Sequence, residues 1–477
     1  MTVIQVRVPK VNTTPDNPHR GMHRWRNQNF APIQTTVQYQ RFLWKDLERD
    51  DGTIDLTKLD QFFASAALSG RRAAFRIQVV VTGDGSPKRG CPADIPVTIC
   101  TDTNPDYNEL HVPQWNSSVF LQRISRLLKA IGAKYNGDPR LAWVDIGVYG
   151  NWGEWHVSGF CGERATLESL KAIIDAHATA FSKSQLLMLT DYEPGFLYAM
   201  NKETLKPIGM RRDSWGQVHF DKISARPETM KFINERWKVA PFIIEAWPPI
   251  DFAVAARQIP QYHIASAGNG NLRLEWTSLT ANQKTSWLAM HASMGYNYQL
   301  VGLSIDTEQK TIQQQWVNTG SCPSYDEWKI KYNFRRNGET IASVVTTLDL
   351  RKVIDATVHT ESFDIAVPAG EYELVLQVEP VLSNLKAMTI ANFPSGALGT
   401  HTIGEAQNPE ETLIAKLQET VKQLQTELAS TKASLETVQN TVITLNADKD
   451  SLAGQLHQVH TELTRVREAI KHLAASL

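Results

Sequence analysis

The sequence predicts an α/β protein: a (β/α)8 TIM-type barrel, then a small antiparallel β-sandwich, then a C-terminal α-helical coiled coil. Three observations predict this order. Short apolar runs alternate with amphipathic segments from residue 17 to about 295, strands with alternating polarity follow to residue 393, and a heptad repeat begins at Ile414. A chain of 477 residues is also too long for a single hydrophobic core.

Residues 1–295 are predicted to form the barrel, because this region contains eight candidate strands. Amphipathic segments with apolar residues at helical spacing separate several of them, and this alternation is typical of a (β/α)8 barrel. The strands are Pro18–Trp25, Val37–Trp44, Arg72–Val81, Leu141–Tyr149, Leu186–Asp191, Ile208–Asp213, Pro241–Trp247 and Tyr262–Ala267, and the clearest helices are Leu56–Ser69, Ser118–Tyr135, Thr166–Ser182 and Pro227–Trp237.

Residues 296–393 are predicted to form the β-sandwich. Turn signals such as Asn337-Gly338 and Pro368-Ala369-Gly370 separate short alternating runs. A carbohydrate-binding module and a cover for the barrel are both compatible with this domain, and the structural role is favoured. The expected strands are Gln299–Ile305, Thr311–Val317, Trp328–Asn333, Ala342–Leu348, Glu361–Ile365 and Tyr372–Glu379.

Residues 394–412 are expected to be a linker, and residues 413–477 an oligomerisation stalk. Apolar residues occupy nearly every a position from Ile414 and nearly every d position from Leu417, with Lys449 at a and Thr431 at d as polar exceptions. A single helix cannot bury this seam, so the sequence predicts a homo-oligomer. Valine at several d positions favours a parallel trimer, whereas Lys449 leaves a dimer possible. The alternative is one long helix folded back on the barrel.

Composition excludes several classes of function. With 49 basic and 50 acidic residues, the formal net charge of -1 favours neither nucleic acid nor an anionic membrane as a partner. No apolar span of 18 residues predicts membrane insertion, and the N-terminal residues lack the apolar run of a signal peptide. We therefore expect no conventional secretion, and the compartment remains open.

No cofactor is predicted either. The sequence contains no GxGxxG after a strand, no GxxxxGK[ST] and no GxSxG. His19 and His23 are four residues apart on an expected strand and loop, so no metal site is predicted. The four cysteines form no CxxC pair. Cys91 and Cys100 are spaced to close a short loop, and free thiols are equally compatible with the pattern.

The residues that point to chemistry are two glutamates at the ends of barrel strands. Glu154 follows the buried strand that begins at Leu141, and Glu245 lies in the seventh strand in the segment PFIIEAWPP. Glycoside hydrolysis needs two carboxyl groups that flank the scissile bond. The fourth and seventh strands lie nearly opposite one another in a barrel, so Glu154 and Glu245 are the predicted catalytic pair.

Polar and aromatic residues near these strand ends are the predicted carbohydrate contacts. Asn151 is expected to bond a sugar hydroxyl, and the tryptophans to stack on sugar faces. The others are expected to contact the substrate or to orient the glutamates, although any single carboxylate at a strand end can instead serve only to bind an arginine. The full set is Arg41, Arg76, Tyr149, Asn151, Trp152, Trp155, His156, Asp191, Arg212, Asp213 and Trp247.

The segments NPHRGMHRW, RFLWKDLERDDGTIDLTKLDQF and YGNWGEWH resemble the opening of uncharacterised glycoside-hydrolase-like barrel proteins. VNTGSCPSYDEW is similar to the NxGxAPxY segment of the sandwich in that family, with Cys322 where alanine is usual. The resemblance covers about residues 12–392. It implies a barrel of the large retaining glycosidase clan, with Glu154 as acid/base and Glu245 as nucleophile. In that clan asparagine directly precedes the acid, whereas Gly153 stands there in this chain.

The predicted function is therefore a retaining glycoside hydrolase that acts on an oligo- or polysaccharide, in which a raised pKa lets Glu154 protonate the glycosidic oxygen. The alternative is a non-catalytic, multivalent carbohydrate-binding adhesin or receptor-binding fibre. A third possibility is a scaffold whose barrel has lost its sugar cleft. A gap of roughly 5 to 5.5 Å between the carboxyl groups favours the enzyme. A glutamate held by an arginine favours binding alone.

Overall fold

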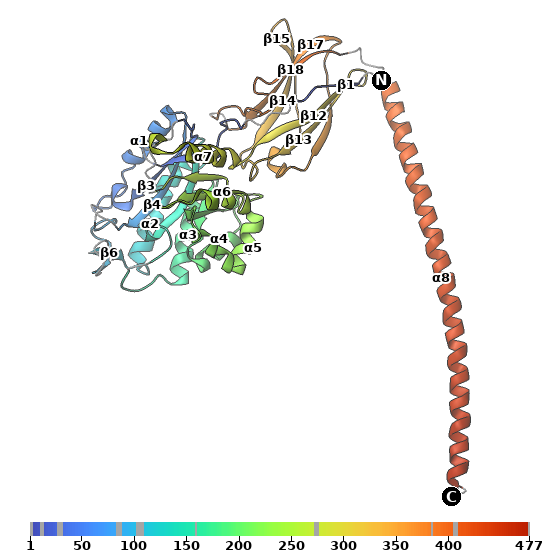
Figure 1. Ribbon diagram of the computed structural model, residues 1–477. Coiled ribbons are helices and arrows are strands. Elements are labelled where there is room, and N and C mark those ends of the chain that lie inside the picture. Colours follow the sequence, from blue (N-terminus) through green and yellow to red (C-terminus); the bar gives the residue numbers. More distant parts are fainter. Residues whose placement is uncertain are drawn as a thin grey trace. The chain divides into compact units, whose positions relative to one another are not determined.

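The computed structural model describes residues 3–9, 14–25, 32–82, 88–101, 109–157, 160–270, 276–382, 385–403 and 409–475. The chain divides into two compact units, Met1–Gly404 and Glu405–Leu477 (Figure 1). The first unit contains a barrel and a β-sandwich, and the second contains one long helix. Each unit is described by itself.

The first unit is built on a closed barrel of eight parallel strands, as predicted. Its strands follow the order β10-β11-β2-β3-β4-β7-β8-β9 around the barrel. Every residue of β4 and of β7 is buried, because a parallel strand is covered by side chains on both faces. The eight strands are β2 (Gly21–Trp25), β3 (Val37–Leu43), β4 (Arg72–Val80), β7 (Leu141–Asn151), β8 (Leu186–Leu189), β9 (Gly209–Trp215), β10 (Phe242–Ala246) and β11 (Ser266–Gly268).

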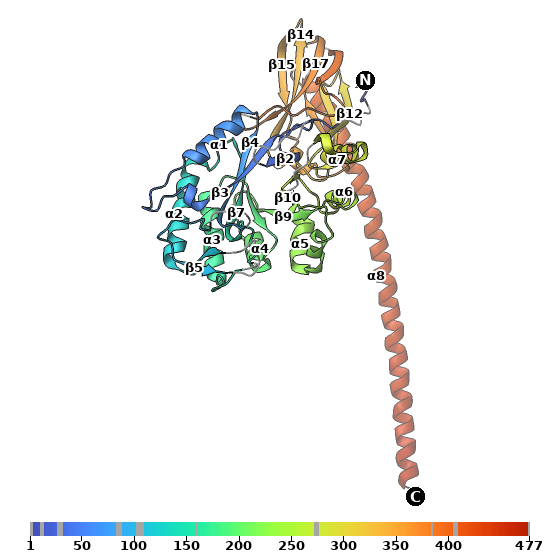
Figure 2. The ribbon, with the colours of Figure 1, turned by 60° about the vertical axis from the view of Figure 1, so that its left-hand side comes forward.

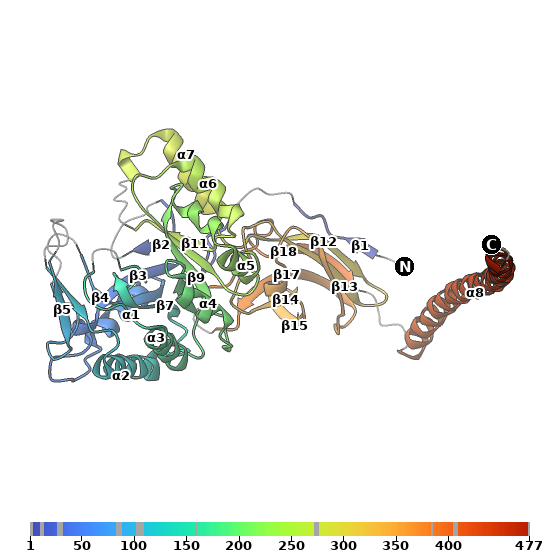
Figure 3. The same cartoon turned by 90° about the horizontal axis from the view of Figure 1, so that it is seen from below.

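Helices surround this barrel, and their caps match the sequence (Figure 2). The Ser117 side chain accepts a hydrogen bond from the Phe120 amide at the start of α2, and Thr280 forms a capping box with Gln283 at the start of α7. Figure 3 shows α6 and α7 side by side. The α-helices are α1 (Thr57–Leu68), α2 (Ser118–Tyr135), α3 (Leu167–Ala180), α4 (Glu193–Asn201), α5 (Pro227–Arg236), α6 (Phe252–Gln261) and α7 (Ala281–Ser293), and the short 3-10 helices are Trp44–Asp46, Phe220–Ala225, Trp276–Ser278 and Leu350–Lys352.

The segment between β4 and α2 carries a small hairpin of β5 (Val97–Cys100) and β6 (Leu110–Pro113). A disulfide joins Cys100 to Cys161, which lies beyond the end of β7. Cys91 and Cys322 are buried free thiols, so the short Cys91–Cys100 loop that the spacing allows does not form. The disulfide instead ties the segment after β4 to the segment after β7.

The β-sandwich consists of two four-stranded antiparallel sheets that share one hydrophobic core. The six predicted strands are present. Two further strands lie outside the predicted range: β1 pairs with β12, and β18, which falls within the expected linker 394–412, pairs with β17. The sheets are β1 (Val3–Gln5), β12 (Tyr298–Asp306), β13 (Thr311–Asn318) and β16 (His359–Asp364), and β15 (Glu339–Val345), β14 (Trp328–Arg336), β17 (Gly370–Pro380) and β18 (Ala397–Ile403).

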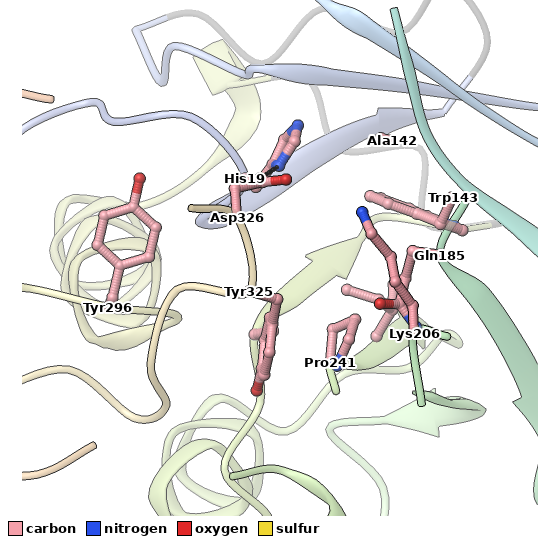
Figure 4. Close-up of a pocket in the computed structure, with 11 residues that line it drawn as sticks. His19, Ala142, Trp143, Gln185, Lys206, Pro241, Tyr296, Tyr325 and Asp326 are labelled. Carbon is pink, nitrogen blue, oxygen red and sulfur yellow. Dashed lines mark hydrogen bonds and ion pairs between the residues drawn. The ribbon is translucent and has the colours of Figure 1, made fainter. Parts of the chain in front are cut away.

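The sandwich contacts the barrel at the end where the barrel strands begin. The His19 ring hydrogen-bonds with the Asp326 carboxylate, and Arg72 Nη1 lies 3.5 Å from the same carboxylate. Burial opposes ionisation of Asp326, but the charges of His19 and Arg72 lower its pKa. A cavity of about 40 Å³ lies beside this cluster, and Trp143 and Tyr325 help to line it (Figure 4). Because this is the amino-terminal end of the barrel, we assign the cluster to stability.

The second unit is α8 (Pro409–Ala475), one uninterrupted helix of 67 residues. It contains no break at which a helix could fold back on itself. The described apolar side chains at its a and d positions are exposed in the single chain, from Leu417 at 54% to Ile470 at 62%. No described helix of the protein is long and apolar enough to span a bilayer.

Candidate active site

An open cleft of about 540 Å³ lies where the barrel strands end. Its walls contain aromatic rings that suit sugar faces and several titratable side chains. This is the end at which barrel enzymes carry their active sites. The aromatic residues are Trp25, Trp152 and Trp247, and the titratable ones are Arg41, Glu154, His156, Asp191, Asp213, His219 and Glu245.

A tight turn after β7 positions Glu154. Trp152, Gly153 and Trp155 all have positive φ values, and the Trp155 amide bonds back to the Tyr149 carbonyl at 3.0 Å. A Cβ atom on Gly153 would lie only 2.9 Å from the Ile77 carbonyl oxygen. This close approach requires glycine at the position where the resembled clan has asparagine.

The two predicted catalytic glutamates meet at one guanidinium nitrogen. Arg41 Nη2 lies 2.8 Å from Glu154 Oε1 and 2.9 Å from Glu245 Oε2. The two oxygen atoms cannot be farther apart than these two distances laid end to end. That limit is close to the roughly 5 to 5.5 Å gap of retaining glycosidases. The same nitrogen is therefore within hydrogen-bond distance of one oxygen of each carboxylate.

Each glutamate also contacts a second, buried arginine. Arg76 Nη1 donates to Glu154 Oε1 at 3.1 Å, and Arg211 forms an ion pair with Glu245. Both arginines also interact with Asp145, which is fully buried in β7 and accepts a hydrogen bond from Tyr39. The floor of the cleft is therefore a network of charges that compensate one another without solvent.

The electrostatics of Glu154 differ from the prediction. Burial favours its neutral form, but attraction to Arg41, a hydrogen bond with His156 and attraction to Arg76 together lower the pKa of Glu154. The prediction of a raised pKa is therefore wrong, because no sequence pattern indicates that Arg41 and Arg76 converge on this carboxylate. Glu154 carries its negative charge at neutral pH. Although burial opposes it, the interaction with Glu154 raises the pKa of His156.

Two aspartates in the same cleft have raised pKa values, in contrast to Glu154. Burial, followed by repulsion from Glu154, raises the pKa of Asp213 to about 6. Burial also raises the pKa of Asp191, despite the attraction of Arg212. Asp213 Oδ1 and Asp191 Oδ2 are buried and have no hydrogen-bond partner among the described residues. The pKa values of these two carboxyl groups are raised, whereas the pKa of Glu154 is lowered.

The structure brings together most, but not all, of the predicted contact residues. Arg41, Trp152, His156, Asp191, Asp213 and Trp247 line the cleft with both glutamates. Arg76 lies beneath them with no exposed surface. Arg212 is turned away and donates to the Phe220 and His219 carbonyls, so it positions the segment that carries His219.

Three predicted contacts lie in the hydrophobic core instead. Trp155 is fully buried and donates to the Ile146 carbonyl at 2.7 Å, and Tyr149 packs against Trp155. Asn151 is also buried, and its amide donates to Thr82. The prediction that these three residues contact sugar is wrong. The tight turn rotates alternate side chains of the motif into the protein, and only Trp152, Glu154 and His156 face the cleft.

Sequence reasoning missed several residues of the site. Trp25 lines the cleft at the end of β2, and its ring lies 4.9 Å from the Arg41 guanidinium. Gln78 and His219 also line it. A tryptophan that ends a predicted barrel strand was a usable signal. His219 lies in a segment with no apolar periodicity, so no pattern indicated it. Among the described residues, no cluster of His, Cys, Asp or Glu could hold a metal ion.

No protein-family model matches the sequence, and no curated protein is a significant match. Solved structures similar to this chain include glycoside hydrolases. The catalytic domain of the major endoglucanase from Xanthomonas campestris pv. campestris is 12% identical with a TM-score of 0.31, and the match covers 54% of this chain and 84% of that domain. A broad-specificity endoglucanase from Ruminococcus champanellensis with bound cellotriose is 11% identical with a TM-score of 0.34, covering 54% of this chain and 82% of its own.

Bacteroides uniformis beta-glucuronidase 2 is 11% identical with a TM-score of 0.28, and the match covers 79% of this chain and 46% of that chain. All of these similarities are remote. The assignment of a (β/α)8 barrel rests on the strand order of the barrel itself, and the interpretation of the cleft rests on its own residues.

Proposed function

We propose that the barrel is a retaining glycoside hydrolase that acts on an oligo- or polysaccharide, with Glu245 as the nucleophile. The observation that supports this most is an open cleft in which three tryptophans surround several carboxyl groups at the end of the barrel strands. Hydrolysis of a glycoside needs one ionised carboxylate at the anomeric carbon and one carboxyl group that donates a proton. Arg41 and Arg211 both form ion pairs with Glu245 and hold its carboxyl group in position.

The test is product release from a panel of polysaccharides and aryl glycosides. Glu245→Gln should reduce release of reducing sugar at least ~1,000-fold, since it removes the attacking oxygen. Glu154→Gln should also lose most activity, because Glu154 holds Arg41 in place and supplies negative charge beside the oxocarbenium-like transition state. Wild-type rates in both variants would reject the proposal. Leu205→Ala, which removes a 78% exposed side chain outside the cleft, is the control.

The alternative is a carbohydrate-binding protein without catalysis, and one observation favours it. Arg41 bridges both glutamates, and each also contacts a second arginine, so neither carboxylate needs a substrate to compensate its charge. A glycan array that detects binding, combined with no hydrolysis product from any bound glycan, would support this alternative. Release of product from a bound glycan would exclude it.

We also propose that α8 joins several copies of the chain, with a parallel trimer favoured over a dimer. Its apolar side chains recur at heptad spacing and are exposed to water in the single chain. Exposure of so many apolar side chains is unfavourable, and packing against further helices would bury them. Several barrels on one stalk would raise the effective concentration of sites near a polysaccharide surface. This arrangement serves a hydrolase and a binding protein equally.

A further inference from the structure

We propose that Asp213, and not Glu154, is the proton donor to the glycosidic oxygen, paired with Glu245 as nucleophile. This inference rests on the proposed hydrolase function and deepens it. A donor and a nucleophile must have the sugar between them, and Arg41 Nη2, within 2.9 Å of an oxygen atom of each carboxylate, competes with a sugar for contact with both.

Glu154 is also poorly suited to carry a proton. Its Oε1 atom lies 2.8 Å from Arg41 Nη2 and 3.1 Å from Arg76 Nη1, and its Oε2 atom lies 3.5 Å from His156 Nε2. Both oxygens therefore face nitrogen atoms that donate protons. A carboxyl group whose oxygens accept from cations is stabilised as the anion. This arrangement suits charge stabilisation rather than acid catalysis.

Asp213 has the required position. It lies on β9, the direct neighbour of β10, which carries Glu245. Ile244 pairs with Arg212 and Ala246 with Trp215, so the register shift places Glu245 opposite Asp213 and Ser214. Neighbouring strands are ~4.8 Å apart, and both side chains line the cleft. Asp213 and Glu245 are therefore neighbours in the wall of the cleft.

Asp213 is also in the required state. Its Oδ1 atom is buried without a hydrogen-bond partner among the described residues, so the carboxylate lacks the contacts that stabilise Glu154. Burial and the charge of Glu154 raise the pKa of Asp213 to about 6, against the attraction of the arginines. The charged or titratable groups that act on it are Glu154, Arg211, Arg41, Arg76, Asp191, His156 and Arg212.

The reaction balances with these two residues. A Glu245 oxygen forms a bond to the anomeric carbon while the bond from that carbon to the leaving oxygen breaks, and the electron pair stays on the leaving oxygen. That oxygen takes the proton of Asp213 and departs as an alcohol. In the second half, water attacks the anomeric carbon, gives a proton to Asp213 and releases Glu245 as a carboxylate.

The test compares two leaving groups in three variants. Removal of an acid slows a glycoside with a poor leaving group far more than an aryl glycoside with a good one, because only the first needs protonation. Asp213→Asn should lose ~1,000-fold on the natural substrate and less than ~10-fold on a dinitrophenyl glycoside. Glu154→Gln should lose activity on both substrates alike. Asp191→Asn is the matched control, a second aspartate of the cleft with a raised pKa.

The pH dependence of kcat/KM gives a second readout. The wild-type rate should fall as pH rises through about 6, the pKa of Asp213. Glu154→Gln should move this fall to lower pH, because it removes the repulsion that raises the pKa, and Asp213→Asn should abolish it. A leaving-group effect confined to Glu154→Gln or to Asp191→Asn would overturn the proposal.

Infrared difference spectra separate this inference from the proposed function. A protonated carboxyl band that titrates near pH 6 in the wild type and disappears in Asp213→Asn would support Asp213 as the proton carrier even if no substrate is hydrolysed. If that band is present but no substrate is hydrolysed, the proposed hydrolase function is rejected and the assignment of the proton to Asp213 stands. Persistence of the band in Asp213→Asn would reject the proton assignment.

Discussion

At the residue scale, Gly153 constrains the turn that carries Glu154. It has a φ of +69°, and the space beside its Cα is closed by the Ile77 carbonyl and the Arg76 side chain. Only glycine accepts both conditions. The turn that it permits directs Glu154 toward Arg41 and Arg76 while Trp155 enters the core. A single residue without a side chain thus decides which members of the motif reach solvent.

The Gly153→Ala variant should unfold more easily and lose activity. Its new methyl group would meet the Ile77 carbonyl oxygen at 2.9 Å, in addition to the cost of the left-handed backbone. We expect a loss of about 3 kcal/mol in the free energy of unfolding and at least a tenfold lower kcat/KM. Gly70→Ala is the matched control, because its φ is +66° with no atom within 4 Å.

Gly70→Ala isolates the backbone cost, which we expect to be about 1 kcal/mol. Chemical denaturation of both variants measures the difference. Equal losses in the two variants would show that the close approach at Gly153 is relieved by movement and does not constrain the turn.

At the scale of elements, the barrel and the sandwich are held by ion pairs at the start of the barrel strands. Asp326 faces His19 and Arg72, and each of these three side chains is mostly buried. A charge that loses its partner in such a place is costly. The stability of the junction between the barrel and the sandwich therefore depends strongly on Asp326.

Asp326→Asn should lower the free energy of unfolding by about 3 kcal/mol at pH 7, because Arg72 is left buried without its counter-charge. Since folding lowers the pKa of Asp326, its contribution is present above the ordinary pKa of an aspartate, about 3.9, and is lost as pH falls below that value. The difference from wild type should therefore shrink in acid.

Thermal unfolding from pH 7 to pH 3 measures this trend. Glu228→Gln, which breaks an exposed ion pair with Lys231 in α5, should change stability by less than about 0.5 kcal/mol. A Glu228→Gln effect as large as that of Asp326→Asn would contradict the assigned role of the junction.

Periodicity alone predicted most of these elements. Buried strands such as β4 and β7 are mostly apolar, and all eight barrel strands were found within a few residues of their ends. β1 and β18 were missed because three or seven residues of mixed polarity carry too little pattern, and their partners are distant in sequence.

The candidate site was predictable only in part. Strand ends indicated Glu154 and Glu245, and both line one cleft; their catalytic roles stay a prediction. The charge state of Glu154 was not predictable, because it depends on Arg41 and Arg76, which approach it from two other strands. The orientation of Tyr149, Asn151 and Trp155 depends on positive φ angles within one turn. No sequence spacing reveals either feature.

At the scale of the whole molecule, α8 presents a seam that one chain cannot bury. Leu435 and Val442 are 56% and 49% exposed at a positions. Ile443 is 66% exposed but lies at a b position, outside the seam. This difference allows a controlled test of oligomerisation.

Light scattering should give the full-length protein a mass of three chains. Leu435→Asp with Val442→Asp should shift it toward one chain, since two buried charges in each helix disrupt the core of a coiled coil. Thr437→Asp with Ile443→Asp adds the same charge at c and b positions and should leave the mass unchanged. A mass of two chains would indicate a dimer, and a wild-type monomer would reject the oligomer.

The covalent link between Cys100 and Cys161 has a practical consequence for every one of these experiments. It closes a sequence separation of 61 residues that includes α2 and β7, and a ring of that size stabilises a fold by roughly 4 kcal/mol. Thiols stay reduced in an ordinary bacterial cytosol. Protein purified from such a host with a reducing agent is therefore a different sample from protein folded in air, and kinetic constants from the two should be compared before either is taken as native.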